Sequence, residues 1–92
     1  MIKDVKNDLT SNRFFLEIEG DEVYLMYDES KNVIDLYSTY TPPQLRGKGL
    51  AGKVVKAALE YAKGKNLKVI PSCWYVKKFI EDNPEYQSLI IH

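Results

Sequence analysis

Apolar and polar residues alternate along the first third of the chain. In the segments 13–19 and 23–27, apolar side chains recur at every second position, which is typical of strands with one buried face. Gly20-Asp21 separates the two segments, so they predict a β-hairpin. After a polar turn at 28–32, a run rich in β-branched and aromatic residues predicts a third strand over 33–41. Residues 3–12 show no clear period and predict a loosely ordered start.

From Leu50 on, the apolar residues follow a helical period and no longer alternate with polar ones. Apolar residues recur there at three- and four-residue steps, opposite a row of lysines, which predicts a helix over 50–63 lying on a sheet, with Gly64 just past its end. The apolar run 67–70 predicts a short buried strand, parallel to the third strand because a helix connects them. A second helix is predicted from Cys73 or Trp74 to Asp82, and the tail 86–91 could add a final strand.

The element order β-β-β-α-β-α predicts an α+β fold with a mostly antiparallel sheet and one parallel pair at its centre. A chain of 92 residues has room for one domain, which we assign to residues 1–92. No window approaches the roughly 20 apolar residues of a membrane span, and the amino terminus has no apolar stretch followed by a cleavage site. The single Cys73 agrees with a reducing compartment, so we expect a cytoplasmic protein and, by default, a monomer.

The net charge of zero hides a polarised distribution. Residues 1–43 carry four basic and nine acidic side chains, whereas residues 44–68 carry seven basic side chains and only Glu60. The positive segment favours an anionic ligand near residue 44 and beyond. Because the chain as a whole is neutral and shows no nucleic-acid-binding motif, we do not expect a nucleic-acid partner.

The segment 41–52 joins the third strand to the first helix. Pro42-Pro43 cannot donate backbone hydrogen bonds, so the strand should end there, and Gly47 and Gly49 allow a tight path with N–H groups aimed at an anion. The segment therefore predicts a phosphate-binding loop. On the glycines alone, an ordinary strand-to-helix turn remains open. The Walker A spacing is absent, and a dinucleotide fingerprint would need an acidic residue about 20 positions later, where Ser72 and Cys73 stand.

The pattern Gln44-x-x-Gly47-x-Gly49 resembles the acyl-CoA-binding motif [Q/R]-x-x-G-x-[G/A] of the GNAT superfamily of N-acyltransferases. The segment 73–86 is similar to a cysteine-led segment of a very short, stand-alone subgroup of that superfamily, and the resemblance covers roughly residues 36–86. It implies a GNAT-like fold in which the parallel strands splay apart, with acetyl-CoA as the acyl donor and no metal. The implied cofactor-binding residues are the strand end, Ser38, Thr39, Tyr40 and Thr41, and the loop, Gln44, Leu45, Arg46, Gly47, Lys48, Gly49, Leu50 and Ala51.

The catalytic groups are harder to assign. Members of the short subgroup often carry His and Glu where this chain has Ser38 and Tyr40, and the position nearest the tyrosine acid of longer relatives is Phe79. The only histidine is the last residue, His92, and a free terminus is seldom positioned for proton transfer. Cys73 is the candidate catalytic residue, because a thiolate is favoured at a helix start, although most free cysteines are packing residues. Trp74 and Tyr75 are also expected to be packing residues.

The resemblance leads to two hypotheses. The first is an N-acetyltransferase with an open site, which transfers the acetyl group of acetyl-CoA to an unknown amine on a small molecule or a protein lysine. The second is a non-catalytic acyl-CoA sensor or adaptor that keeps the loop but has lost the acid and base groups. Neither requires a membrane.

Overall fold

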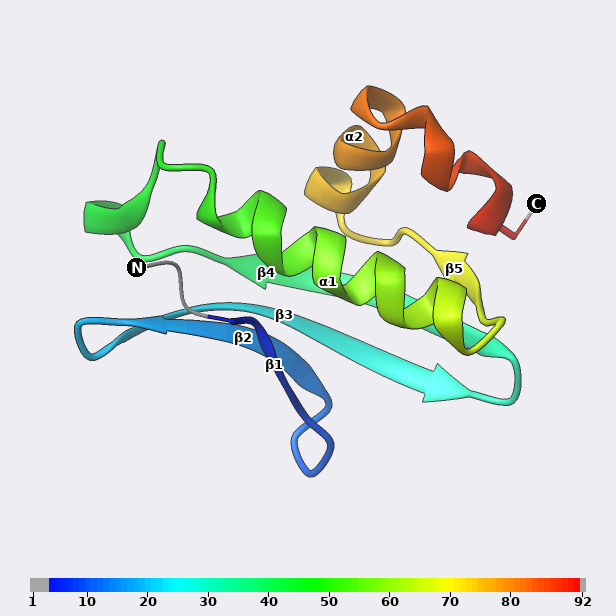
Figure 1. Cartoon of the computed structure of the whole chain (residues 1–92), viewed down its shortest axis with the longest axis horizontal. Helices are drawn as coiled ribbons and strands as arrows, with labels where there is room; N and C mark the ends of the chain where they lie inside the picture. The colour runs from blue at the N-terminus through cyan, green and yellow to red at the C-terminus, as the bar shows by residue number, and fades with distance from the viewer. Residues whose placement is uncertain (1–3, 92) are drawn as a thin grey trace.

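The alternating segments build a five-stranded sheet in the computed structural model, which describes residues 4–91. The hydrogen-bonded order of the strands is β1-β2-β3-β4-β5, antiparallel throughout except for the β4–β5 pair. The elements are β1 (Lys6–Asp8), β2 (Arg13–Ile18), β3 (Asp21–Ser30), β4 (Val33–Tyr40), α1 (Leu50–Gly64), β5 (Lys68–Ile70) and α2 (Trp74–Asp82), with short 3-10 helices at Pro43–Leu45 and Pro84–Leu89 (Figure 1).

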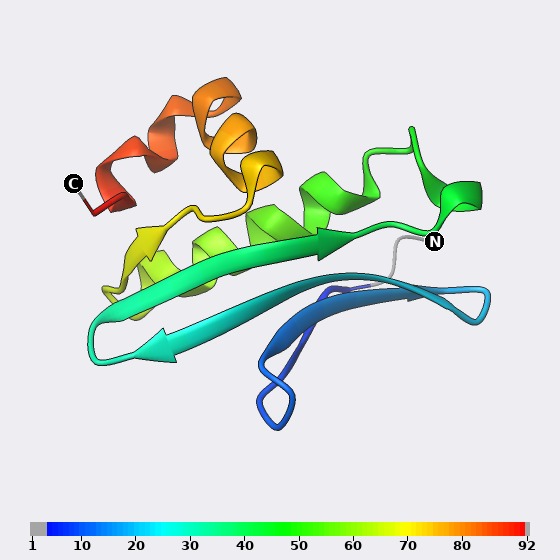
Figure 2. The ribbon, with the colours of Figure 1, turned by 180° about the vertical axis from the view of Figure 1, so that it is seen from behind.

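Both α-helices lie on one side of the sheet (Figures 1 and 2). The alternate residues of β2 and β3 that face α1 are almost completely buried, among them Leu16 and Leu25 at 1% and 0% exposure. α1 meets them with a stripe of small and branched side chains, Val54, Val55, Ala58, Leu59 and Ala62. This packing of a periodic helix on an alternating sheet confirms the predicted α+β fold.

β4 changes its pairing halfway along its length. Its first residues pair with β5 in parallel, from Val33 with Lys68 to Asp35 with Ile70, and the N–H of Cys73 then donates to the carbonyl of Leu36 at 3.0 Å. Toward β3 the register shifts, because Tyr27 pairs with Leu36 while Met26 pairs with Ser38. Tyr37 is thus an extra residue, a β-bulge of the kind that re-aims the side chains after it. Beyond the bulge the chain after β5 turns into α2, and the two parallel segments part.

Several expectations at the two ends of the chain are wrong. Residues 6–8 form strand β1, which pairs with β2 through backbone groups and therefore needs no side-chain period. The parallel pair lies at one end of the sheet order, not at its centre, because the tail forms the 3-10 helix Pro84–Leu89 and not a strand. Only a single bridge, Val69 with Ile90, extends the sheet beyond β5 among the described residues. α1 includes Gly64, and Asn66 adopts the left-handed conformation instead, with φ 57°.

Candidate functional site

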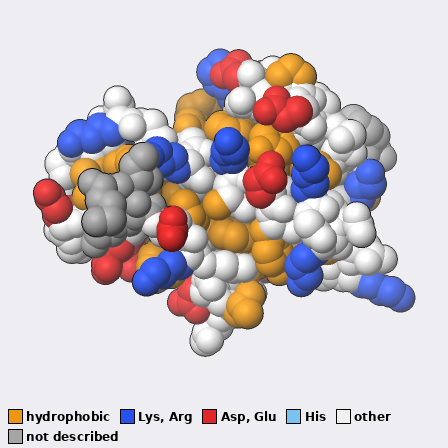
Figure 3. Space-filling view, viewed as in Figure 1, with side chains coloured by type: hydrophobic (Ala, Val, Ile, Leu, Met, Phe, Trp, Pro, Cys, Tyr) orange, Lys and Arg blue, Asp and Glu red, His pale blue; other side chains and the backbone are white. Residues whose placement is uncertain are grey.

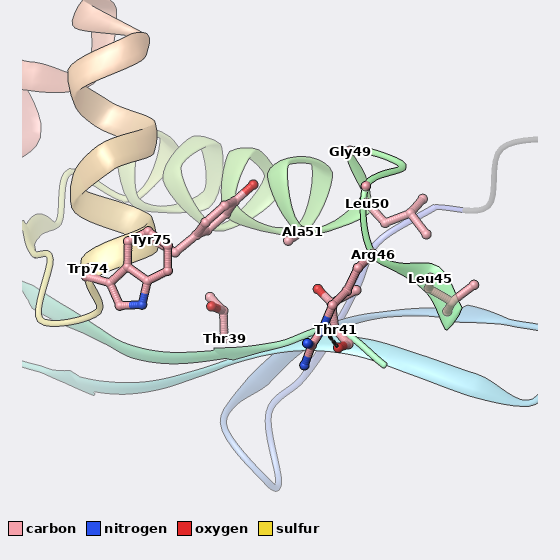
Figure 4. A pocket seen from close by; sticks show the side chains of 10 residues that line it. Thr39, Thr41, Leu45, Arg46, Gly49, Leu50, Ala51, Trp74 and Tyr75 are labelled. Carbon is pink, nitrogen blue, oxygen red and sulfur yellow. Dashed lines mark hydrogen bonds between the residues drawn. The ribbon is translucent and has the colours of Figure 1, made fainter. Parts of the chain in front are cut away.

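A pocket of about 530 Å³ opens where β4 ends, between the loop before α1 and the start of α2 (Figure 4). Thr39 and Thr41 contribute from the end of β4 and the residues just after it, and Trp74 and Tyr75 from the first turn of α2. The rest of the lining is the loop and the helix start, Leu45, Arg46, Gly47, Gly49, Leu50 and Ala51. The predicted loop and strand end therefore meet at one cavity.

Proline and glycine residues determine the path of the loop before α1. Pro42 ends the strand, the short helix Pro43–Leu45 follows, and the buried Leu45 anchors it. Gly47 and Gly49 then adopt φ angles of 79° and 73°, in the left-handed region that disfavours other residues. A Cβ atom at either glycine would meet no atom of the described residues within 4 Å, so these positions border space that the described chain leaves open. The two glycines let the backbone itself form one wall of the pocket.

The start of α1 presents unpaired backbone donors to this space. Gly49 caps the helix without a side-chain hydrogen bond, and the first bond recorded for the helix runs from the N–H of Lys53 to the carbonyl of Gly49 at 3.4 Å. Within residues 4–91, no acceptor is recorded for the N–H groups of Leu50 and Ala51, as expected for a first helical turn. These donors and the positive end of the helix dipole suit an anion.

Arg46 adds a full positive charge beside these donors. Its Nε donates to the carbonyl oxygen of Thr41 at 3.1 Å, which holds the side chain across the loop (Figure 4). The first turn of α1 contains no acidic residue. The loop end of the pocket is therefore an anion-binding environment built from backbone donors and one guanidinium.

Cys73 lies behind the end of the pocket that α2 forms, opposite the loop. It caps α2, is 8% exposed, and does not itself line the cavity, but its Sγ lies 3.5 Å from the hydroxyl of Thr39, which does. Burial raises the pKa of the thiol, whereas the hydroxyl of Thr39 and the N–H groups of Val76, Tyr75 and Thr39 lower it, and the net pKa is below the ordinary value. The net shift is in the direction that favours the thiolate, and the catalytic role of Cys73 stays a prediction.

Trp74 and Tyr75 are the site residues that sequence reasoning missed. The expectation that both are packing residues is wrong for Trp74, which is 74% exposed at the pocket rim. Tyr75 is half-buried, and burial raises the pKa of its hydroxyl. That hydroxyl would lie 3.6 Å from a Cβ at Gly52, so the missing side chain of α1 lets α2 approach closely here. The signal in the sequence was their place just after Cys73 at the predicted helix start.

Besides Cys73, four of the predicted cofactor-binding residues have side chains outside the pocket lining. Ser38 and Tyr40 point to the other face of the sheet, so only their backbone follows the pocket edge. Gln44 donates to the carboxylate of Asp21 at 2.7 Å and thereby fastens the loop to β3. Lys48 is exposed at the loop tip. His92 lies outside the described residues.

Three further observations concern metal ligands, membrane helices and the distribution of charge. Among residues 4–91, no three His, Cys, Asp or Glu side chains gather as a metal site would need, and no described helix is long and apolar enough to cross a membrane. The face in Figure 3 shows lysine and arginine side chains dispersed among acidic and apolar ones, without a continuous basic surface.

The fold and the site define an α+β protein with a glycine-containing loop between a strand and a helix, whose backbone donors face a pocket at a point where two parallel strands part. Comparison with known proteins assigns the chain to a family. The family model of the GCN5-related N-acetyltransferases matches residues 13–89 of the chain. The chain therefore belongs to the GCN5-related N-acetyltransferase family, which confirms the resemblance seen in the loop motif.

Individual relatives support the assignment over most of the chain. Protein NATD1 of Bos taurus is 34% identical over 88 residues, which cover 92% of this chain and 78% of that protein. Protein NATD1 of Danio rerio is 32% identical over 93 residues, covering 96% and 84%. Among solved structures, the solution structure of a GCN5-like protein from Staphylococcus aureus matches with a TM-score of 0.75 and 28% identity, covering 96% of this chain and 87% of that one.

Proposed function

We propose that this protein binds acetyl-CoA in the pocket at the end of β4 and transfers the acetyl group to an amine. The observation that carries the proposal is the parting of β4 and the segment after β5 beside the start of α1. As far as residues 4–91 are concerned, a strand edge and helix donors without recorded partners lie on two sides of one cavity. Membership of the acetyltransferase family supports the choice of ligand.

The loop end of the pocket would hold the phosphate groups of the ligand. The N–H groups of Leu50 and Ala51 and the guanidinium of Arg46 offer hydrogen bonds and positive charge. Gly47 and Gly49 leave room for a close approach to the backbone. The donors present therefore fit a pyrophosphate.

The α2 end of the pocket would hold the reacting group. In the transfer, the amine nitrogen bonds to the thioester carbonyl carbon, the carbon–sulfur bond breaks and CoA leaves as a thiolate. The proton that the amine loses passes to this sulfur or to water, so that free CoA thiol is released. Tyr75 keeps its hydroxyl proton at neutral pH, because burial raises its pKa, and can donate a hydrogen bond there. Thr39 offers a second hydroxyl, which contacts the thiol of Cys73.

Cys73 is our candidate catalytic residue for an alternative two-step route, because its thiol lies directly behind Thr39 and has a lowered pKa. In that route the thiol would take the acetyl group from the thioester, with release of CoA thiol, and then pass it to the amine. We expect Cys73→Ala to abolish turnover and to leave acetyl-CoA affinity unchanged. Cys73→Ser keeps a group that can bond Thr39 but removes the nucleophile. Loss of turnover in both variants would indicate nucleophilic catalysis, whereas an active serine variant would indicate a positioning role. Full turnover in Cys73→Ala would remove the assignment.

A non-catalytic acyl-CoA sensor is the second candidate. It is favoured by the pocket lining, in which the described residues include no carboxylate and no imidazole to take the amine proton. The two candidates differ in one measurement, the release of free CoA thiol when the protein is mixed with acetyl-CoA and an amine. Release that depends on both protein and amine supports the enzyme. Saturable binding without release supports the sensor.

A further inference from the structure

The face of the sheet that points away from α1 is here called the open face. It carries the outward side chains of β2, β3 and β4, of which Glu17, Glu22, Tyr24, Asp28, Asp35 and Tyr40 matter below. Both helices lie on the opposite side in Figures 1 and 2, and no described element covers the open face. A sheet face of this kind is available to a partner.

An aromatic row crosses the open face and ends beside the pocket. Phe15 pairs with Tyr24, and Tyr24 pairs with Tyr40, so the three rings stand side by side on adjacent strands. The rings of Tyr24 and Tyr40 are 5.5 Å apart, and Tyr40 is 43% exposed. Tyr40 lies between Thr39 and Thr41, both of which line the pocket. The row therefore leads along the surface to the proposed reaction site.

Facing carboxylates flank the aromatic row on both sides. Glu17 pairs directly with Glu22, and Asp28 pairs directly with Asp35. Like charges directly opposite each other destabilise a sheet unless a cation lies between them. Within the described chain no cation is recorded for Asp28 or Asp35. The arrangement favours a positively charged partner.

Arg13 shows how a cation binds to this face. Its guanidinium lies 4.7 Å from the ring centre of Phe15 and 5.9 Å from that of Tyr24, and it forms an ion pair with Glu22. The chain thus already places a cation on these rings beside a carboxylate, which is a favourable combination. The exposed ring of Tyr40 and the other carboxylates offer the same chemistry to an external cation.

The spacing of these groups favours a long ligand. Asp28 lies six positions after Glu22 along β3, which corresponds to about 20 Å. A small amine cannot span that distance, and the open face has no described walls to enclose one. We propose that the open face docks a basic, lysine-containing segment of an acceptor protein and directs one lysine toward the pocket at Tyr40. The acceptor chemistry rests on the proposed function, whereas the docking itself does not.

The test is an amide chemical-shift titration of the isotope-labelled protein with a peptide of alternating lysine and glycine. About ten residues suffice to span both carboxylate pairs at roughly 3.3 Å per residue. We expect saturable shifts on β2, β3 and the end of β4, with an affinity that falls as salt is added. Shifts confined to α1 and α2, or no shifts, would overturn the proposal.

A charge-reversal pair provides the matched control. Glu17→Lys with Asp28→Lys changes two exposed side chains of the open face, and Glu81→Lys with Glu85→Lys makes the same change in net charge at exposed positions elsewhere. The first double variant should weaken peptide binding about tenfold or more, and the second by less than about threefold. Equal weakening in both would show only a response to net charge and would overturn the docking surface.

Acetyl-CoA titrations of the same variants separate this inference from the proposed function. Peptide binding on the open face without any acetyl-CoA binding would refute the proposed function and leave the docking surface in place. Acetyl-CoA binding with no peptide binding would refute the docking surface alone. If both ligands bind, acetylation of a small monoamine as efficiently as the peptide would contradict the assigned acceptor class.

Discussion

The two halves of β4 differ in what holds them. The first half, Val33 to Leu36, is hydrogen-bonded to β3 on one edge and to β5 or Cys73 on the other, and Ile34 and Leu36 are completely buried. The second half, Tyr37 to Tyr40, begins at the bulge and pairs only with β3 among the described strands. The first half of β4 thus belongs to the buried scaffold, whereas the second half is the edge that we propose binds acetyl-CoA.

The difference shows how a small chain separates stability from ligand binding. Buried apolar surface and paired backbone groups stabilise the fold, while unpaired backbone groups are available to a ligand. The bulge at Tyr37 marks the boundary, because it turns Thr39 toward the pocket and leaves Tyr40 on the open face. Substitutions in the two halves should therefore affect different measurements.

The largest expected effect is a loss of stability on substitution in the first half of β4. Leu36→Ala should lower the free energy of unfolding by about 3 kcal/mol, because a side chain with 0% exposure leaves a cavity under α1. Tyr37→Ala, one residue on and 42% exposed, should lower it by less than about 1 kcal/mol. Chemical denaturation of both variants checks the contrast. Equal losses would mean that the bulge does not separate the halves.

The next effect is on the loop that faces the second half. Gly49→Val forces a branched side chain onto a φ of 73°, at a strain of about 1–2 kcal/mol, and fills the space beside the helix donors. Acetyl-CoA affinity measured by calorimetry should fall more than about tenfold. Gly64→Val, at the far end of α1 where φ is not left-handed, is the control and should bind normally.

A smaller effect concerns charge at the loop. Arg46→Ala should weaken acetyl-CoA binding about fivefold, because one charged hydrogen-bond donor is lost from an exposed site. The difference from the unchanged protein should shrink as salt is raised. Lys56→Ala, on the outer side of α1, should leave the affinity unchanged. A similar loss in the two variants would point to general attraction of an anion.

The smallest effect is a pH dependence next to the scaffold half. Glu29, paired with Ile34, accepts hydrogen bonds from the hydroxyl of Tyr61 at 2.6 Å and the ammonium of Lys65 at 3.1 Å, and these lower its pKa. A lowered pKa in the folded state stabilises the protein above the ordinary carboxyl pKa, and this stability is lost as the pH falls through the lowered value.

Glu29→Gln should therefore reduce the acid-induced loss of stability between about pH 7 and pH 3. The reduction should stay below about 1 kcal/mol, because solvent screens this partly exposed pair. Denaturation curves at several pH values measure it, with the exposed Glu81→Gln as the reference. Identical pH profiles for the two variants would exclude the tether between β3 and α1.

Local patterns explain what the sequence could predict. The hairpin, the helix α1 and the glycine loop each follow from residues close together in the chain, whose period or φ requirement is visible directly. β1 is a three-residue strand without an alternating pattern that pairs with the neighbouring β2 through backbone groups. The placement of β5 at the end of the sheet depends on its pairing with β4, which is distant in the chain. Those features were therefore missed or misplaced.

The site residues also fall into two groups, those that the local sequence predicts and those that depend on tertiary contacts. Gly47, Gly49 and Arg46 were predicted from the loop itself, whereas Trp74 and Tyr75 reach the pocket because α2 packs closely over Gly52. That approach is a tertiary contact, and the local sequence showed only the position of the two residues just after Cys73. The open face was hidden for the same reason, since Phe15, Tyr24 and Tyr40 become neighbours only through strand register.

The most direct test of the account is a titration of the isotope-labelled protein with acetyl-CoA, followed through its backbone amide signals. We predict saturable shifts at Thr39, at Thr41, in the loop and helix start 46–51, and at 73–75, while the first half of β4 stays unchanged. The absence of saturable shifts at millimolar ligand, or the largest shifts at Val33 to Leu36, would contradict the assignment of the second half of β4 as the acetyl-CoA-binding edge.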